Sequence, residues 1–169
     1  MTILKVVPKE RRSLDEMIKY MTQPAKTHAP LILSSDFAGS LFASCVNLSQ
    51  EAWQQGERSP YIQIILSFDT KTSMERSLST LIEVCRRVEN VLCPPDSSHV
   101  IFGVIHTNTD NIHCHYLIGR TNFTTGQRYR QGKSLFSYKQ EVNRILTQYN
   151  LPQIHCFQGH TYEGGKVND

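Results

Sequence analysis

The stretch from His106 to His115 constrains the fold of this chain most, because three imidazole side chains fall within ten residues of a predicted strand–turn–strand unit. Residues 100–106 (VIFGVIH) are β-branched and apolar enough for a buried strand, and residues 107–111 (TNTDN) are typical of a turn. Residues 112–118 (IHCHYLI) predict a returning strand. We expect the two strands to pair in an antiparallel sheet.

Side-chain alternation along a strand decides which of these residues share a face of the sheet. His113 and His115 point to one face and Cys114 to the other, while His106, at the mouth of the hairpin, can reach both histidines. Three neutral imidazoles on one patch suit a divalent transition metal and leave coordination positions open, as in catalytic sites. We therefore predict a metal site at His106, His113 and His115. The remaining histidines are interpreted as ordinary structural or surface residues: His28, His99, His155 and His160.

The length of 169 residues fits one compact domain with a sizeable core, which we place at residues 1–158, followed by a flexible tail at 159–169. No apolar run approaches the length of a membrane span, and the N-terminus lacks a signal-peptide pattern. The cysteines are odd in number and form no CxxC pair, which indicates free thiols in a reducing cytoplasm. We expect a cytoplasmic protein that does not insert into a membrane.

Positive charge is concentrated after the histidines, although the formal net charge is only +3. Residues 111–140 contain no Asp or Glu. The basic residues of this segment are Arg120, Arg128, Arg130, Lys133 and Lys139. A surface of one sign beside the predicted metal site favours a phosphate backbone as partner. The alternative interpretation is an ordinary solvated loop.

A helix is predicted near the N-terminus, where Ser13 and Glu16 have the spacing of a capping box and Pro24 predicts the end. Tyr20 falls in the last turn of this helix. Taken in isolation, a tyrosine there is typical of a half-buried packing residue, and Lys26 is typical of a solvated loop charge. Taken alone, neither residue indicates a function.

Further elements complete a prediction of the fold class. Residues 61–68 predict a strong strand, and residues 3–7 and 30–37 predict weaker ones. Helical spacing of apolar residues predicts a short helix around residues 51–53, a long helix that Thr72 or Ser73 opens and Pro94 stops, and another over residues 135–149. We expect an α+β fold: a central antiparallel sheet of about five strands, with helices mainly on one face and the histidines exposed on the other.

Nearly the whole chain resembles the nuclease domain of conjugative and mobilisation relaxases, in the MobA-like P class of the HUH endonuclease superfamily. The motifs that carry the resemblance are IKYMTQPAKT at residues 18–27, a strand at residues 62–68 followed by a long helix, GVIHTNTDNIHCH at residues 103–115 and TGQRYR at residues 125–130. The resemblance implies the HUH relaxase fold.

The resemblance also implies an activity: site- and strand-specific nicking and rejoining of single-stranded DNA at an origin of transfer, which initiates conjugative transfer or mobilisation of a plasmid or integrative element. Tyr20 would attack a phosphodiester, leaving a 5′-phosphotyrosyl link and a free 3′-hydroxyl. A phenol with an ordinary pKa of about 10 is a poor nucleophile at neutral pH and needs a positive field. The three histidines would hold a divalent cation, Mn²⁺ or Mg²⁺, although Ni²⁺, Co²⁺ or Zn²⁺ would also suit them.

Other residues receive roles from the resemblance or from their position. Asp110, in the turn, either orients a ligand imidazole, helps to take the tyrosine proton, or bonds its own backbone as an ordinary turn residue. Many relatives carry Asp two residues after the first histidine, where this chain has Asn108, and a bulky hydrophobe where it has Cys114. DNA contacts are expected from Lys26, Arg120, Arg128, Arg130 and Lys133.

The resemblance implies partners as well: single-stranded DNA at an origin of transfer, a relaxosome accessory DNA-binding protein and a type IV coupling protein, with the chain itself a bacterial monomer. Relaxases of this class usually continue into a long C-terminal portion, so residues 159–169 would then be a linker to a missing region. Three alternatives stay open. They are a rolling-circle initiator or transposase that uses Tyr138, a cupin-like metalloprotein acting on small molecules, and a non-catalytic DNA-binding module.

Overall fold

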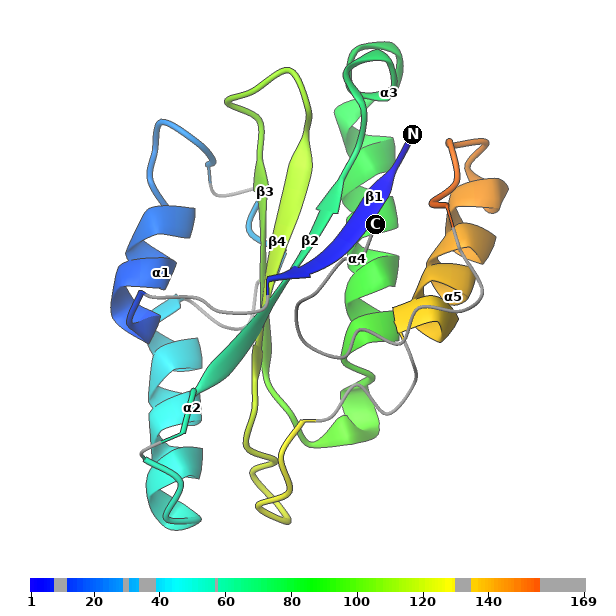
Figure 1. The fold of residues 1–169 in the computed structure, drawn as a ribbon. Coiled ribbons are helices and arrows are strands. Elements are labelled where there is room, and N and C mark those ends of the chain that lie inside the picture. Colours follow the sequence, from blue (N-terminus) through cyan, green and yellow to red (C-terminus); the bar gives the residue numbers. More distant parts are fainter. Residues whose placement is uncertain (8–11, 29–30, 34–38, 57, 130–134, 156–169) are drawn as a thin grey trace, which may run out of the picture.

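A computed structural model describes residues 1–7, 12–28, 31–33, 39–56, 58–129 and 135–155 of the chain. In these segments four strands form one antiparallel sheet in the order β1-β2-β4-β3, and helices lie on both sides of it (Figure 1). The predicted α+β class with a central antiparallel sheet is therefore confirmed. None of the described helices is long and apolar enough to cross a membrane.

The elements follow one another in a simple order along the chain. The strands are β1 (Ile3–Val7), β2 (Tyr61–Ser67), β3 (Ile101–His106) and β4 (His113–Gly119). The α-helices are α1 (Leu14–Met21), α2 (Gly39–Ala52), α3 (Thr70–Glu75), α4 (Leu78–Leu92) and α5 (Leu135–Gln148). The predicted tail at residues 159–169 lies outside the described residues.

Strand β4 lies inside the sheet and is buried along almost its whole length, because it carries apolar side chains on both faces. Tyr116 and Ile118 pack with α4 and α5 in the larger core. Leu117, between them in sequence, packs with Phe102 and Val104 of β3 against α1 and α2 in a second core. A strand that is apolar on both faces needs cover on both.

The expectation of helices mainly on one face was therefore wrong. Helices α1 and α2 cover one face of the sheet, and α4 and α5 cover the other (Figure 1). Among the described cysteines, Cys85, Cys93 and Cys114 are buried free thiols and Cys45 is a half-buried one. Cys156 lies outside the described residues.

The number of strands and two helix boundaries also differ from expectation. Of the predicted strand at residues 30–37, Ile32 forms an isolated bridge to Val104, and residues 30 and 34–37 lie outside the described part. Helix α2 begins at Gly39, well before the predicted short helix. The long helix divides at Arg76 into α3 and α4, because Ser77 caps a new helix.

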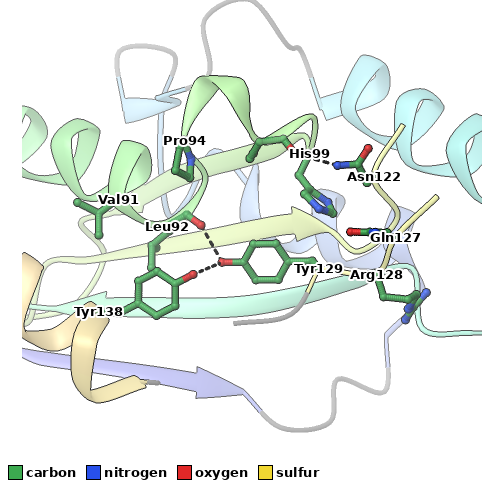
Figure 2. A pocket seen from close by; sticks show the side chains of 10 residues that line it. Val91, Leu92, Pro94, His99, Asn122, Gln127, Arg128, Tyr129 and Tyr138 are labelled. Atoms are coloured by element: carbon green, nitrogen blue, oxygen red, sulfur yellow. Dashed lines mark hydrogen bonds between the residues drawn. The ribbon is translucent and has the colours of Figure 1, made fainter. Parts of the chain in front are cut away.

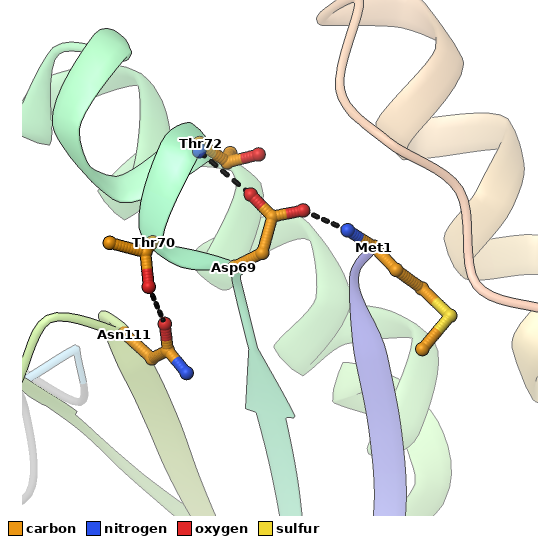
Figure 3. Close-up of polar contacts among 5 residues, drawn as sticks. All are labelled: Met1, Asp69, Thr70, Thr72 and Asn111. Atoms are coloured by element: carbon orange, nitrogen blue, oxygen red, sulfur yellow. Dashed lines mark hydrogen bonds and ion pairs between the residues drawn. The ribbon is translucent and has the colours of Figure 1, made fainter.

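The hairpin turn between β3 and β4 is held by α3. The Thr70 hydroxyl donates to the side-chain oxygen of Asn111 at 2.8 Å, and the backbone N–H of Ile112 donates to Ser73 Oγ at 2.9 Å. Asp69 caps α3 by accepting from Thr72 N–H, and its other oxygen meets the amino group of Met1 (Figure 3). The turn that precedes His113 is thus fixed from outside the hairpin.

Helix α1 has the predicted capping box. Ser13 Oγ accepts from Glu16 N–H at 3.3 Å, and the Glu16 carboxylate accepts from Ser13 N–H at 2.8 Å. Met17 and Met21 are buried against the sheet, at 1% and 0% exposure, which fixes the rotation of the helix. Tyr20 is consequently held half-buried at the edge of this contact.

Replacing Ser13 with Ala should lower the free energy of unfolding by about 1 kcal/mol, because the first turn of α1 loses a hydrogen-bond acceptor. The matched control is Ser77→Ala, since Ser77 caps α4 through the same bond to Thr80 N–H. Urea unfolding followed by circular dichroism measures both. An unchanged midpoint for Ser13→Ala beside a lowered one for Ser77→Ala would show that this cap does not stabilise α1.

Candidate active site

Three histidines meet at the end of the β3–β4 hairpin, on the face of the sheet that α1 covers. The register pairs His106 with His113, and His115 lies two residues further along β4. Ring centroids are 4.5 Å apart for His106 and His115, 5.0 Å for His113 and His115, and 5.2 Å for His106 and His113. One nitrogen from each ring lies within 4.8 Å of the others, so the cluster can hold a metal ion.

Each imidazole is oriented by a hydrogen bond through its other nitrogen. His106 Nε2 lies 2.8 Å from the carbonyl oxygen of Met21, and His113 Nδ1 lies 2.8 Å from that of Asn111. A carbonyl oxygen only accepts, so these nitrogens carry the protons. The lone pairs remain on His106 Nδ1 and His113 Nε2. Ligand histidines in metalloproteins are commonly oriented by such bonds.

The third imidazole is oriented by a side chain that sequence reasoning missed. The amide of Gln63, on β2, lies 2.7 Å from His115 Nδ1. An amide can present either nitrogen or oxygen. With the oxygen as acceptor, His115 Nδ1 carries the proton and Nε2 keeps its lone pair.

The unpartnered nitrogen of His115 tests whether a metal fits here. His115 Nε2 is buried and has no hydrogen-bond partner within the described part of the chain. A buried polar atom without a partner costs free energy, which a metal ion at this position would offset. The donor set of His106, His113 and His115 therefore fits a divalent transition metal, with coordination positions left for other ligands.

Burial keeps His106 and His115 uncharged at neutral pH. The pKa of His115 is lowered to about 3, mainly by burial and also by the neighbouring His106 and His113. The pKa of His106 is also lowered, again mainly by burial. Only 1% of His106 and 5% of His115 is exposed, so the expectation of histidines on an open face was wrong. Neutral imidazole is the form that binds a metal.

Tyr20 lies beside the histidines, held there by α1. Its ring centroid is 6.0 Å from that of His106 and 6.2 Å from that of His115, with edge-to-face geometry in both pairs. Lys26 Nζ lies 3.3 Å and Arg12 Cζ 4.5 Å from the centroid of the Tyr20 ring. The phenol is thus brought next to the candidate metal site and between two cationic groups.

The loop after α1 is tied to the hairpin. The backbone N–H of Thr107 donates to the carbonyl oxygen of Lys26 at 3.0 Å, and Lys26 N–H donates to Gln23 at 2.9 Å. Together with the bond from His106 to Met21, these contacts join the end of α1 to the first residue after β3. Tyr20, Lys26 and the histidines therefore form one connected unit.

The other predicted site residues do not gather here. Asp110 is exposed at the tip of the turn, and it makes no hydrogen bond or ion pair with the described residues. Arg120 and Arg128 lie beyond the opposite end of β4, where their guanidinium groups donate to main-chain carbonyls of Tyr61 and Ser59. Arg130 and Lys133 lie outside the described residues.

Tyr138, the alternative nucleophile, belongs to the larger core on the other face of the sheet. It is 7% exposed and lies at the wall of a pocket of about 800 Å³, where its hydroxyl is 3.3 Å from that of Tyr129 (Figure 2). The Tyr129 hydroxyl donates in turn to the carbonyl oxygen of Leu92 at 2.7 Å. The whole sheet separates Tyr138 from the histidines, so it cannot act with them.

Two residues of the site were not predicted from the sequence, Gln63 and Arg12. Gln63 had a signal: it is a polar residue in an apolar strand, and alternation places it with Ile65 on the histidine face, where Ile65 pairs with His115. No signal in the sequence pointed to Arg12, because its contact with Tyr20 depends on how α1 packs.

The family model described as "Relaxase: MobA/VirD2-like, nuclease domain" matches residues 20–151. That span begins at Tyr20 and contains all three histidines. No curated protein and no solved structure is similar enough to count as a match.

Replacing Gln63 with Ala should weaken binding of Co²⁺ about 10- to 100-fold, because His115 loses the partner that fixes its tautomer. Gln63→Glu should retain most of the affinity, since a carboxylate also accepts from Nδ1–H. Isothermal titration of the metal-free protein measures this. Gln50→Ala is the matched control, because Gln50 is also buried but bonds to Gln55 and Arg58, away from the site. Equal affinities for the Gln63→Ala and Gln50→Ala variants would contradict the assignment.

The metal-free protein should lose stability as the pH falls below 6.5. The pKa of His115 is about 3 in the folded chain against 6.5 as the ordinary value, so the unfolded state takes up the proton first. Between pH 7 and pH 5, the His115→Gln variant should therefore lose about 2 kcal/mol less free energy of unfolding than the wild type loses. Urea unfolding in EDTA measures it, with exposed His28→Gln as control. The same pH dependence in wild type and His115→Gln would refute this account.

Proposed function

The chain belongs to the family of MobA/VirD2-like relaxase nuclease domains, and on this premise we propose that it nicks and rejoins single-stranded DNA at an origin of transfer through a tyrosine–DNA link. Nicking of DNA is the activity of the family. The specific site, the covalent intermediate and the role in conjugative transfer or mobilisation of a plasmid or integrative element are our proposals.

The observation that carries the proposal is the position of Tyr20 beside three histidines that can hold a metal. The nucleophile and the histidines lie far apart in the matched span, and packing of α1 on the sheet brings them together. A core tyrosine would not need two cations against its ring, yet Lys26 and Arg12 both lie there. This grouping supports phosphoryl transfer in a positive field.

In the proposed reaction Tyr20 Oη attacks the scissile phosphorus. The Oη–P bond forms as the bond from phosphorus to the 3′-oxygen breaks, and the departing oxygen takes up a proton to become a free 3′-hydroxyl. The phenolic proton is lost to solvent or to a nearby base. The phosphodiester is conserved as a 5′-phosphotyrosine, so attack by a 3′-hydroxyl reverses the step and rejoins the strand.

A divalent cation held by His106 Nδ1, His113 Nε2 and His115 Nε2 would supply Lewis-acid polarisation of the scissile phosphate. Mn²⁺ or Mg²⁺ is our proposal for the physiological ion, and Ni²⁺, Co²⁺ or Zn²⁺ would bind the same nitrogens. Lys26 and Arg12, which lie against the Tyr20 ring, would attract the negatively charged phosphate to the attacking oxygen. Lys5, on β1, adds to the same positive field, which extends to His115.

Several parts of the proposal rest on family resemblance. Asp110 remains a candidate for proton uptake or ligand orientation, because it is exposed in the turn and lies shortly before His113 in the sequence. We also propose a relaxosome accessory DNA-binding protein and a type IV coupling protein as partners, a monomeric chain, and action in the bacterial cytoplasm.

The alternatives have less support. A replication initiator or transposase that uses Tyr138 would need this tyrosine on the histidine face, and it lies on the other. A cupin-like protein would hold its metal inside a β-sandwich, whereas the described strands form a single sheet between helices. A non-catalytic DNA-binding module remains an outcome of the experiment that follows.

Replacing Tyr20 with Phe should abolish the covalent adduct with DNA, because the attacking oxygen is removed. The substrate is a pool of 3′-labelled single-stranded oligonucleotides that tile the DNA around the gene. The protein is incubated with Mn²⁺ and the pool, and adducts are separated on a denaturing gel. Wild type should give a protease-sensitive labelled band, which EDTA removes.

The matched control is Tyr138→Phe, which should still form the adduct because its hydroxyl lies across the sheet. Adduct formation by Tyr20→Phe would transfer the nucleophile to another residue. Failure of the wild type to form any adduct, although it binds both Mn²⁺ and DNA, would indicate a non-catalytic module.

A further inference from the structure

We propose that a second surface, at the opposite end of β4 from the histidines, binds an unpaired base and the adjoining phosphates of the single-stranded substrate. This surface, called here the distal platform, consists of Trp53, Phe123, Arg58, Arg120 and Arg128. The identity of its ligand as single-stranded DNA rests on the proposed function. The platform itself is argued from its own geometry and charge.

The first argument is that two large aromatic side chains stay exposed on segments that contact each other. Trp53, just after α2, is 42% exposed, and Phe123, in the loop after β4, is 54% exposed. They are joined, since Trp53 Nε1–H donates to the carbonyl oxygen of Phe123 at 3.3 Å. Exposed aromatic rings in a fixed arrangement suit base stacking, which tolerates any sequence because every base has a π-face.

The second argument is that the partly exposed Trp53 ring is held in place by close contact with the loop after β4. Gly126, with a φ of 69°, lies against the ring so closely that a Cβ there would come within 2.4 Å of two indole carbons. Only glycine permits this approach. The ring is therefore seated on the loop backbone, and its exposed part is a rigid platform.

The loop beneath the ring is itself rigid. Thr121 and Arg128 form an antiparallel bridge, and Gln55 Nε2 donates to the carbonyl oxygen of Gly126 at 2.6 Å. The side-chain oxygen of Asn122 accepts two backbone N–H groups within the turn, at 2.9 and 2.8 Å. A pre-ordered loop loses little conformational entropy when a ligand binds.

The third argument is a group of like charges that have no carboxylate partner among the described residues. Arg128 lies close enough to Arg120 and Arg58 for both to lower its pKa, although burial lowers it most. None of the three forms an ion pair with any described residue. Arg120 and Arg128 are anchored through neutral oxygens, at 3.1 Å to Tyr61 and 2.8 Å to Ser59. Three neighbouring guanidinium groups repel one another unless an anion binds, and phosphate matches their geometry.

The distal platform can share one DNA strand with the active site. Six residue steps of extended chain lead from His113 to Gly119 along β4, which is a distance of about 20 Å. Single-stranded binding sites of about 4–16 nucleotides are common. Helix α1, which carries Tyr20, and helix α2, which ends just before Trp53, also lie on the same side of the sheet (Figure 1).

The chain offers a direct test, because Trp53 is its only tryptophan. Intrinsic fluorescence therefore reports on the platform alone. A mixed-sequence single-stranded oligonucleotide is titrated into the Tyr20→Phe variant in EDTA, so that neither chemistry nor metal contributes. We expect quenching of Trp53 fluorescence that saturates with DNA, and no quenching by inorganic polyphosphate, which carries charge without bases.

Substitutions separate stacking from charge. Phe123→Ala and Trp53→Ala should each weaken DNA binding about tenfold in fluorescence anisotropy, and Trp53→Phe should retain most of it. Arg58→Gln should reduce the slope of log affinity against log salt by about 0.7, as loss of one phosphate contact predicts. Leu48→Ala, a change at a 63% exposed position of α2 outside the platform, is the control and should change nothing.

The outcomes distinguish this inference from the proposed function. Adduct formation by wild type together with unchanged Trp53 fluorescence and unchanged affinity of Phe123→Ala would overturn the platform and leave the nicking function intact. Quenching by polyphosphate as strong as by DNA would also overturn it, because it would show a general anion or protein-docking surface. Quenching by DNA with loss in Phe123→Ala would support the platform even if no adduct formed.

Discussion

The pairing of His106 with His113 across β3 and β4 is the constraint on which the site depends. A shift of this register by one residue would send the β4 imidazoles to the opposite face and bring Cys114 into their place. Register is specified here because both faces of β4 are packed: Tyr116 must enter one core and Leu117 the other. The two cores therefore fix the position of the histidine cluster as well as the fold.

Burial keeps His106 and His115 in the neutral form that can bind a metal, and it also lowers the stability of the metal-free chain. Desolvation keeps His106 and His115 uncharged. Each of the three rings is oriented by a hydrogen bond to a different element: His106 to Met21 of α1, His113 to Asn111 of the turn, and His115 to Gln63 of β2. The lone pairs are thereby directed inward before any metal binds. Such preorganisation gives up some stability of the metal-free chain in exchange for affinity.

The parts of the fold and site that could be predicted depend on local rules. Alternation along one strand placed His113, His115 and Cys114 correctly, and the capping box located α1, because both patterns act within a few residues. Features that depend on packing between elements distant in the sequence could not be predicted from these local patterns. The cover on both faces of β4, the approach of Arg12 to Tyr20 and the separation of Arg128 from the histidines all depend on tertiary contacts. The role of Tyr20 itself came from family resemblance, since a tyrosine at a helix end has no local signal.

The central claim is that Tyr20 and the histidine cluster form one reaction centre. Mass spectrometry of the proteolysed covalent complex tests it most directly, because it locates the residue that carries the nucleotide. The account predicts a nucleotide mass on the peptide that contains Tyr20, present with Mn²⁺ and absent with EDTA. A nucleotide on a peptide that contains any other tyrosine, or equal modification without metal, would contradict it.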